Sequence, residues 1–256
     1  MKKGNDMDIA VVLVVVLAVF LGSLMRATFG FGDSVISMPL LALLPIPFST
    51  SVALVGLVGF TVALFFAVSG WKDKDPVVLK KLSLTTIIGI PFGLLLVRFA
   101  SQTWISFILG ILLIAYSIFS LTGSRQRQEE LQRRFSDPNY SYPFGFASGM
   151  LGSAYNMNGI PVVLYATMRD WSPKQFTGNV QSHFIVSSTL IILSHFIGGF
   201  WTKELGIYYL LSIPAVLAAI ALGNRIYAAI KVDRFKQYVF YIIFVLGVFN
   251  FLEIFS

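Results

Sequence analysis

The chain contains no cysteine among its 256 residues. This absence excludes a disulfide framework and every metal site built on thiolates. Charged residues are also scarce, because they make up 12% of the sequence, about half the fraction of a soluble domain. Hydrophobic residues make up 56%, and the mean hydropathy is +0.79. The composition therefore indicates a membrane protein.

The residues that intramembrane enzymes use are missing as well. The apolar runs contain no HExxH, Walker A or GxSxG motif and no acidic pair. A lipid pyrophosphatase built from inverted repeats would need clustered glutamates and a metal. The only glutamates here are Glu129, Glu130, Glu204 and Glu253, which fall in expected loops or at the chain end. We therefore expect no enzymatic activity, no catalytic residue, no cofactor and no bound metal.

Long uncharged segments dominate what is present. Each is close to the ~20 residues that a helix needs to cross a hydrocarbon core about 30 Å thick. The ten-residue segments of alternating polarity that mark an outer-membrane barrel are absent. The sequence thus predicts an all-α polytopic membrane protein, with helices over residues 51–70, 82–97, 104–124, 175–202, 205–224 and 238–252.

Two further apolar segments are interrupted by polar and helix-breaking residues. The first interruption is MRATFGFGDS at residues 25–34, and the second is GSAYNMNGIP at residues 152–161. Irregular backbone at membrane depth survives only when it is enclosed by protein or lines a watery cavity. Paired broken segments indicate a transporter binding site. We expect residues 25–34 and 154–161 to be non-helical tips that line one water-accessible cavity. Cysteines substituted for Phe31 and Met157 should therefore react with small hydrophilic thiol reagents.

The chain reads as an internal duplication. The polar stretch 122–141 divides it into a first repeat, residues 1–121, and a second repeat, residues 142–256. Each repeat opens with a broken segment and continues with three further helices, of which the second carries an Ile-Pro step. The landmarks that recur in order are Ser49-Thr50-Ser51 and Thr177-Gly178-Asn179 as expected helix starts, and Ile90-Pro91 and Ile213-Pro214 inside apolar runs.

Charge counting separates two topologies. If both broken segments re-enter, 14 basic residues face one side and four the other; if both cross the membrane, the split is 11 to 7. The positive-inside rule favours the re-entrant model. It leaves three crossings per half, which makes the second half inverted and the linker 122–141 cytoplasmic. The 14 residues are Lys72, Lys74, Lys80, Lys81, Arg125, Arg127, Arg133, Arg134, Arg169, Lys174, Arg225, Lys231, Arg234 and Lys236.

Arg26 is the sharpest candidate for a binding residue, because it is a cation far from any expected loop. It either contacts a substrate anion or serves only as the internal partner of Asp33, seven residues later. Gly30 and Gly32 allow backbone N–H groups to turn inward, and a helix that starts near Ser34 would direct its positive end at the break. The first break therefore predicts an anion site.

The second break offers Asn156, Asn158 and Gly159 in the corresponding place. Asparagine tolerates left-handed backbone and supplies amide donors, although these residues could equally form only a structural turn. Pro39 and Pro161 follow the two breaks, and we expect both to stand at helix starts, where a missing N–H costs least.

Polar residues also interrupt the run 175–202. Gln181 and His183 are candidates for substrate contact, and His183 could be linked to a proton. The alternative for His183 and for His195 is hydrogen bonding between helices. Their separation of twelve residues is not that of paired metal ligands.

The motifs resemble a known family. Gly30-Phe31-Gly32-Asp33-Ser34 with Pro39, together with residues 148–152 and 156–161, is similar to the glycine-rich signatures of the sulfite exporter TauE/SafE family, also called toluene-sulfonate uptake permeases. The resemblance implies transport of sulfite and organosulfonates across a bacterial cytoplasmic membrane. It places the site at Gly30, Gly32, Gly149 and Gly159. The polar residues Asp33, Ser34, Asn156 and Asn158 stand where the family usually has glycine.

We therefore predict a multi-pass secondary transporter of small sulfur-containing anions such as sulfite, sulfoacetate or taurine-derived compounds, with export as the expected direction. Its partners are the anion, membrane lipid and a coupling proton or ion. Nucleic acid is not expected, because the basic residues sit in short loops. Two alternatives stay open: a gradient-driven carrier of another small organic anion or metabolite, and a membrane assembly or chaperone subunit without transport activity.

Overall fold

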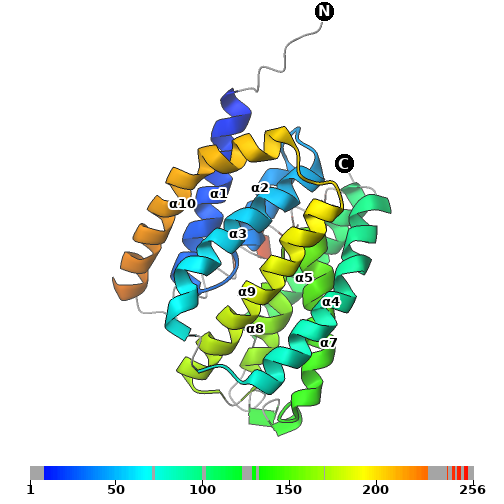
Figure 1. Cartoon of the computed structure of the whole chain (residues 1–256), viewed down its shortest axis with the longest axis vertical. Coiled ribbons are helices and arrows are strands. Elements are labelled where there is room, and N and C mark those ends of the chain that lie inside the picture. Colours follow the sequence, from blue (N-terminus) through cyan, green and yellow to red (C-terminus); the bar gives the residue numbers. More distant parts are fainter. Residues whose placement is uncertain are drawn as a thin grey trace, which may run out of the picture.

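Apolar runs without strand periodicity fold as helices throughout the described chain (Figure 1). The computed structural model describes residues 9–70, 73–99, 102–122, 129–130, 133–169, 171–229, 241, 244–245, 247–248 and 251–252. Over these residues no strand occurs. The elements are α1 (Ile9–Phe29), α2 (Asp33–Ala42), α3 (Phe48–Gly70), α4 (Pro76–Phe99), α5 (Gln102–Leu121), a short 3-10 turn η2 (Pro138–Tyr140), α7 (Ser141–Tyr155), α8 (Gly159–Thr167), α9 (Pro173–Ile197) and α10 (Lys203–Ala229).

Five of these helices are long and apolar enough to cross a membrane: α1, α3, α4, α9 and α10. Their spanning parts have 19 to 24 residues, which at 1.5 Å per residue corresponds to roughly 30 Å. The predicted all-α polytopic class is thus confirmed. The helix expected at residues 238–252 lies largely outside the described residues, although 241, 244–245, 247–248 and 251–252 are helical.

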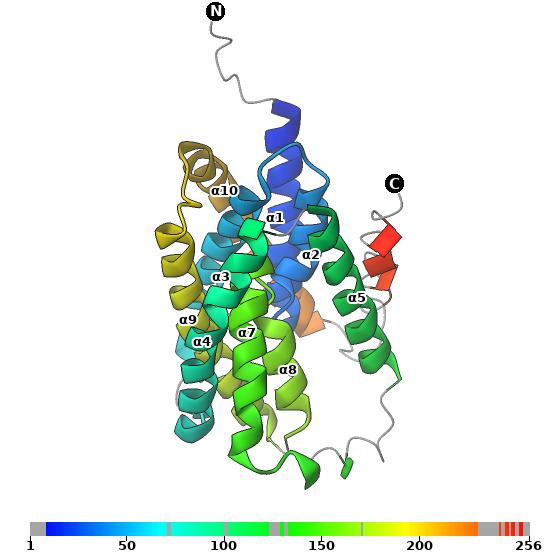
Figure 2. The ribbon, with the colours of Figure 1, turned by 90° about the vertical axis from the view of Figure 1, so that its right-hand side faces the viewer.

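Each broken segment folds as a helical hairpin. In the first, the Ser37 hydroxyl of α2 donates to the Ala18 carbonyl of α1 at 3.0 Å. In the second, the Ser148 hydroxyl of α7 donates to the Asn158 carbonyl at the start of α8 at 2.9 Å. Helices α2 and α8 have 10 and 9 residues, about half the length that a membrane crossing needs. The hairpins enter from opposite ends of the molecule and their tips meet in the middle (Figure 2), which agrees with the re-entrant alternative.

The tips are shorter than the sequence suggested. The prediction of non-helical backbone over residues 25–34 and 154–161 is wrong, because only residues 30–32 and 156–158 lie between helices. Arg26 belongs to the last turn of α1, where a cation complements the negative end of the helix dipole. Asp33 belongs to the first turn of α2, where an anion is equally favourable. Local electrostatics therefore extends both helices toward the break.

Two other expectations about helix starts need correction. Pro39 lies inside α2, six residues after its first residue, whereas Pro161 lies in the first turn of α8 as expected. The run 177–179 is interior to α9, which instead begins at Pro173. A capping box explains this start, since Ser172 and Gln175 satisfy each other's backbone N–H groups.

Each hairpin packs against a helix of the other half. The first hairpin packs through α1 against α10 of the second half, and the second hairpin packs through α7 against α4 of the first half. Helices α3 and α9, which follow the hairpins, pack against each other. These matched pairings support the duplication, while its inverted relation and the boundaries at residues 121 and 142 stay predictions.

Glycines bring α4 and α7 into backbone contact. Gly89 and Gly93 on α4 face α7, and Gly145 and Gly149 on α7 face α4. A Cβ on Gly149 would overlap the carbonyl oxygen of Thr86. Each helix thus carries a small-xxx-small motif at the interface, which is how membrane helices approach closely.

We expect Gly149→Ala to destabilise the protein by about 1–3 kcal/mol, because the added methyl overpacks rigid backbone. Gly206→Ala is the matched control, since no atom lies within 4 Å of the Cβ it would add. Thermal unfolding of both variants in detergent tests this. Equal midpoints for the two variants would contradict the close packing of α4 on α7.

Candidate functional site

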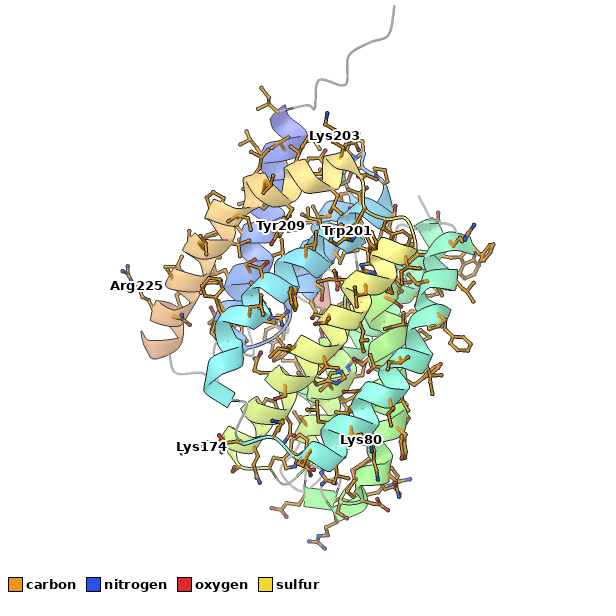
Figure 3. The ribbon with its side chains drawn as sticks, in the orientation of Figure 1. Lys80, Lys174, Trp201, Lys203, Tyr209 and Arg225 are labelled. Atoms are coloured by element: carbon orange, nitrogen blue, oxygen red, sulfur yellow. The ribbon has the colours of Figure 1, made fainter. Side chains whose placement is uncertain are left out.

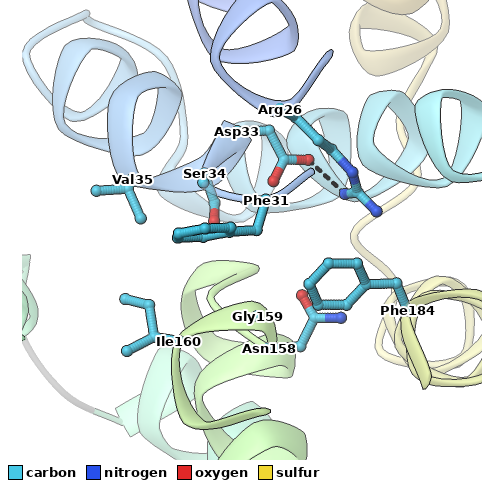
Figure 4. A pocket seen from close by; sticks show the side chains of 10 residues that line it. Arg26, Phe31, Asp33, Ser34, Val35, Asn158, Gly159, Ile160 and Phe184 are labelled. Carbon is cyan, nitrogen blue, oxygen red and sulfur yellow. Dashed lines mark hydrogen bonds and ion pairs between the residues drawn. The ribbon is translucent and has the colours of Figure 1, made fainter. Parts of the chain in front are cut away.

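The two hairpin tips enclose a small pocket at the centre of the protein (Figure 4). Its walls come from the end of α1, the first tip with the start of α2, the start of α8 and one turn of α9. The lining residues are Arg26, Phe31, Gly32, Asp33, Ser34, Val35, Asn158, Gly159, Ile160 and Phe184.

A buried ion pair forms one side of this pocket. The Nη1 atom of Arg26 donates to Oδ2 of Asp33 at 2.7 Å, and the two side chains are 4% and 11% exposed. The pair lies against the backbone of α3, because a Cβ on Gly59 would come within 2.7 Å of Oδ2 and 3.1 Å of Nη1. The expected pairing of Arg26 with Asp33 is therefore present.

The guanidinium of Arg26 is only partly satisfied. Its Nε and Nη2 atoms are buried and have no hydrogen-bond partner within the described part of the structure. The ring of Phe184 lies 4.8 Å from its central carbon and covers one face. Unpaired N–H groups of a buried guanidinium are costly. The arrangement thus leaves donors ready for a ligand with oxygen acceptors.

Two helix N-termini line the same pocket. Helix α2 follows Gly32, whose φ of 92° requires glycine, and helix α8 follows Asn158. Neither cap residue bonds to its helix through a side chain. No side chain therefore caps the start of either helix. The Ile160 N–H bonds to the Met157 carbonyl at 3.4 Å, and both helix dipoles favour an anion at this place.

Polar side chains fix the tips to α3 and α9. Asn156 adopts φ 59°, and its amide donates to the Val52 carbonyl on α3 at 2.6 Å. The Gln181 amide donates to the Gly30 carbonyl at 3.0 Å. The Asn158 amide donates to the Ser187 hydroxyl at 2.6 Å. The Gln181 bond satisfies a tip carbonyl that lies outside the helices, and the two asparagine bonds anchor the second tip to α3 and α9.

Both histidines form bonds between helices. Nε2 of His183 lies 3.0 Å from the Ser148 hydroxyl, which donates its proton to the Asn158 carbonyl. His183 therefore donates through Nε2–H. His195 likewise donates from Nε2 to the Ser153 carbonyl at 2.9 Å. The interhelical alternative is confirmed for both residues, and a proton-linked role for His183 stays a prediction.

The predicted site residues separate into two groups. Six line the pocket: Arg26, Gly32, Asp33, Ser34, Asn158 and Gly159. Of the other four, Gly30 and Asn156 belong to the tips themselves, and Gln181 and His183 hold the tips from α9. Met157 is fully buried in the core, so the expectation that it faces a watery cavity is wrong.

The sequence did not reveal the apolar walls. Phe31, Val35, Ile160 and Phe184 line the pocket, but in a chain with 15% aromatic residues they resemble lipid-facing side chains. Only the position of Phe31 between two glycines could have suggested a role. Among the described residues, no three His, Asp or Glu side chains come together as metal ligands. The donors at hand are a guanidinium and backbone N–H groups, which bind anions.

Comparison with protein families matches Sulfite exporter TauE/SafE over residues 15–250. The chain belongs to this family. The match includes both hairpins and the long helices that enclose them. No curated protein and no solved structure matches the chain.

Membership in the TauE/SafE family confirms the transporter class. The family consists of membrane transporters and not of enzymes, and it implies an exporter of sulfite or other anions in general. The expected partners are thus a small anion and membrane lipid. The five long apolar helices agree with a multi-pass membrane protein.

The turn at Asn156 yields a test of how the second tip is held. Asn156→Gly removes the bond to Val52 but keeps the left-handed backbone, whereas Asn156→Ala removes the bond and strains the turn. We expect Ala to be less stable than Gly by about 1–2 kcal/mol. Thermal unfolding in detergent measures the difference, and an alanine variant as stable as the glycine variant would show that φ 59° is not required.

Proposed function

We propose that the chain is a secondary transporter that moves small sulfur-containing oxyanions, sulfite and organosulfonates, across the cytoplasmic membrane of a prokaryote. The observation that carries this proposal is the Arg26 guanidinium, buried at the meeting point of two hairpin tips with Nε and Nη2 unpaired. Export is the direction that the family suggests.

The donors suit a group with three oxygens. The guanidinium lies on one side of the pocket, while the N-termini of α2 and α8 approach from other sides. A sulfonate or sulfite has acceptor oxygens in three directions and can meet all of them, whereas a planar carboxylate has only two oxygens. The apolar side chains of Phe31 and Ile160 suit the carbon chain of an organosulfonate.

The hairpin arrangement supports alternating access. We propose that two units, one built on the packed pair α1 and α10 and the other on α4 and α7, rock around the tips and open the pocket to each side in turn. The exchanged packing of α1 on α10 and of α7 on α4 makes each rigid unit contain helices from both halves. Transport is then driven by gradients.

Arg26→Gln tests the anion site. Arg26→Gln together with Asp33→Asn removes both members of the ion pair, so the net charge of the pocket does not change. We expect this double variant to fold but to bind methanesulfonate or sulfite at least tenfold more weakly, a loss of about 1.4 kcal/mol or more. Calorimetry on purified protein measures the affinity, and uptake into proteoliposomes measures the transport rate.

The matched control is Glu130→Gln, which neutralises an exposed carboxylate of the linker and should leave both readouts unchanged. Wild-type transport by the double variant would reject the anion role and leave Arg26 as structure. Binding of acetate but not of any sulfonate would favour a carrier of other organic anions. Failure of the wild-type protein to bind or move any anion would favour an assembly subunit.

Basic residues define the proposed orientation. Lys80 and Lys174 lie at one end of the molecule and Lys203 at the other (Figure 3). The first end also holds the described linker residues Arg133 and Arg134, and Arg169 bonds to linker carbonyls there. We infer that this end is cytoplasmic, by the positive-inside rule. Of the 14 residues counted on it, Lys72, Arg125, Arg127, Lys231, Arg234 and Lys236 lie outside the described residues.

Single cysteines test the orientation cleanly, because the chain has none of its own. An impermeant thiol reagent applied to intact cells should label Lys203→Cys and spare Glu130→Cys until the membrane is opened. The reverse pattern would contradict the cytoplasmic linker.

A further inference from the structure

The pocket has no spare charge that would balance a bound anion. Arg26 and Asp33 form a neutral pair with side chains 4% and 11% exposed. Among the described residues, α3 contributes no charged side chain to this region, and neither does α8. From α9 the only nearby titratable group is His183, and α10 directs Arg225 to the surface (Figure 3). No other charge is thus at hand to compensate an added ligand.

A sulfonate bound to Arg26 would make this region negative. The anion, the carboxylate of Asp33 and one guanidinium sum to one negative charge among side chains that are almost fully buried. An uncompensated charge there is strongly unfavourable. A sulfonate on the unpaired Nε and Nη2 atoms would also lie close to the carboxylate that Nη1 holds, and two like charges so close repel each other.

Protonation of Asp33 removes both problems. One proton from water binds an oxygen of the Asp33 carboxylate, and no other bond changes. The anion then balances the charge of Arg26 alone, and the pocket is neutral again. The neutral carboxyl can donate a hydrogen bond to an anion oxygen.

We propose that Asp33 takes up one proton with each sulfonate bound at Arg26, so that the coupling ion of this transporter is a proton. This inference rests on the proposed function. His183 is not the carrier, because it does not line the pocket and its Nε2 holds Ser148 behind the tip. The proton and the anion then move together as a neutral pair, so an inward proton gradient favours uptake and export requires an internal excess of anion.

Calorimetry can count the protons. Methanesulfonate is the probe, because its charge does not change with pH near neutrality. Its binding enthalpy is measured at one pH in bis-Tris and in Tris, which differ in ionisation enthalpy and carry no competing sulfonate. The difference gives the number of protons taken up. We expect about one proton per anion for the wild-type protein, which requires no variant to fold.

Three variants assign the proton. Asp33→Asn should bind methanesulfonate at least as tightly with no proton uptake, while His183→Gln and the surface control Glu130→Gln should keep the wild-type count. Binding without proton uptake by the wild-type protein would overturn this inference alone. Loss of proton uptake in His183→Gln but not in Asp33→Asn would overturn the inference and assign the proton to the histidine. Absence of binding would overturn the proposed function, and this inference with it.

Discussion

Irregular backbone in the middle of an apolar helical protein must have its polar groups satisfied by the protein itself. The rest of this structure depends on that constraint. At the two turns, residues 30–32 and 156–158, several N–H groups bond to carbonyls of the preceding helix: Gly30 to Arg26, Asn156 to Gly152 and Met157 to Leu151. Val52 of α3 and Gln181 of α9 supply partners for the turns. In the proposed function, the transported anion binds at the starts of α2 and α8, where the helix dipoles favour negative charge.

Close packing of the helices positions both turns at the centre of the protein. The glycines of α4 and α7 let these helices meet at backbone distance, and Gly223 of α10 does the same against Ala27 of α1. Each hairpin is therefore held by a helix of the other half, and its tip is delivered to the centre. A pocket formed in this way belongs to neither half alone, which is the geometry that alternating access requires.

The Arg26–Asp33 pair links stability to transport. A buried pair is rarely retained for stability, because desolvation offsets much of the Coulomb attraction. Here the pair keeps a cation at membrane depth in the absence of substrate, and its carboxylate can be exchanged for a ligand oxyanion. In the proposed function, Asp33, which stands where the resemblance places a glycine, is a working part of the anion site.

Much of the architecture was predictable because it depends on local patterns. The hydrophobic runs determined the helices, the polar interruptions located both breaks, and the seven-residue spacing brought Arg26 and Asp33 within reach across one turn. Left-handed backbone at Asn156 and Gly32 also followed from residue type. Helix ends were less predictable, since Arg26 and Asp33 extend α1 and α2 through dipole interactions that a glycine count does not reveal.

By itself the sequence determined the class, the two breaks and the family, because composition and motifs are properties of the chain. Only the tertiary structure decided that Phe184 covers Arg26, that Asn158 faces Asp33 across the pocket and that Met157 is core. These contacts join residues more than a hundred positions apart. In a membrane protein the lipid side and the interior side of a helix are both apolar, so hydrophobic periodicity does not show which face packs inward.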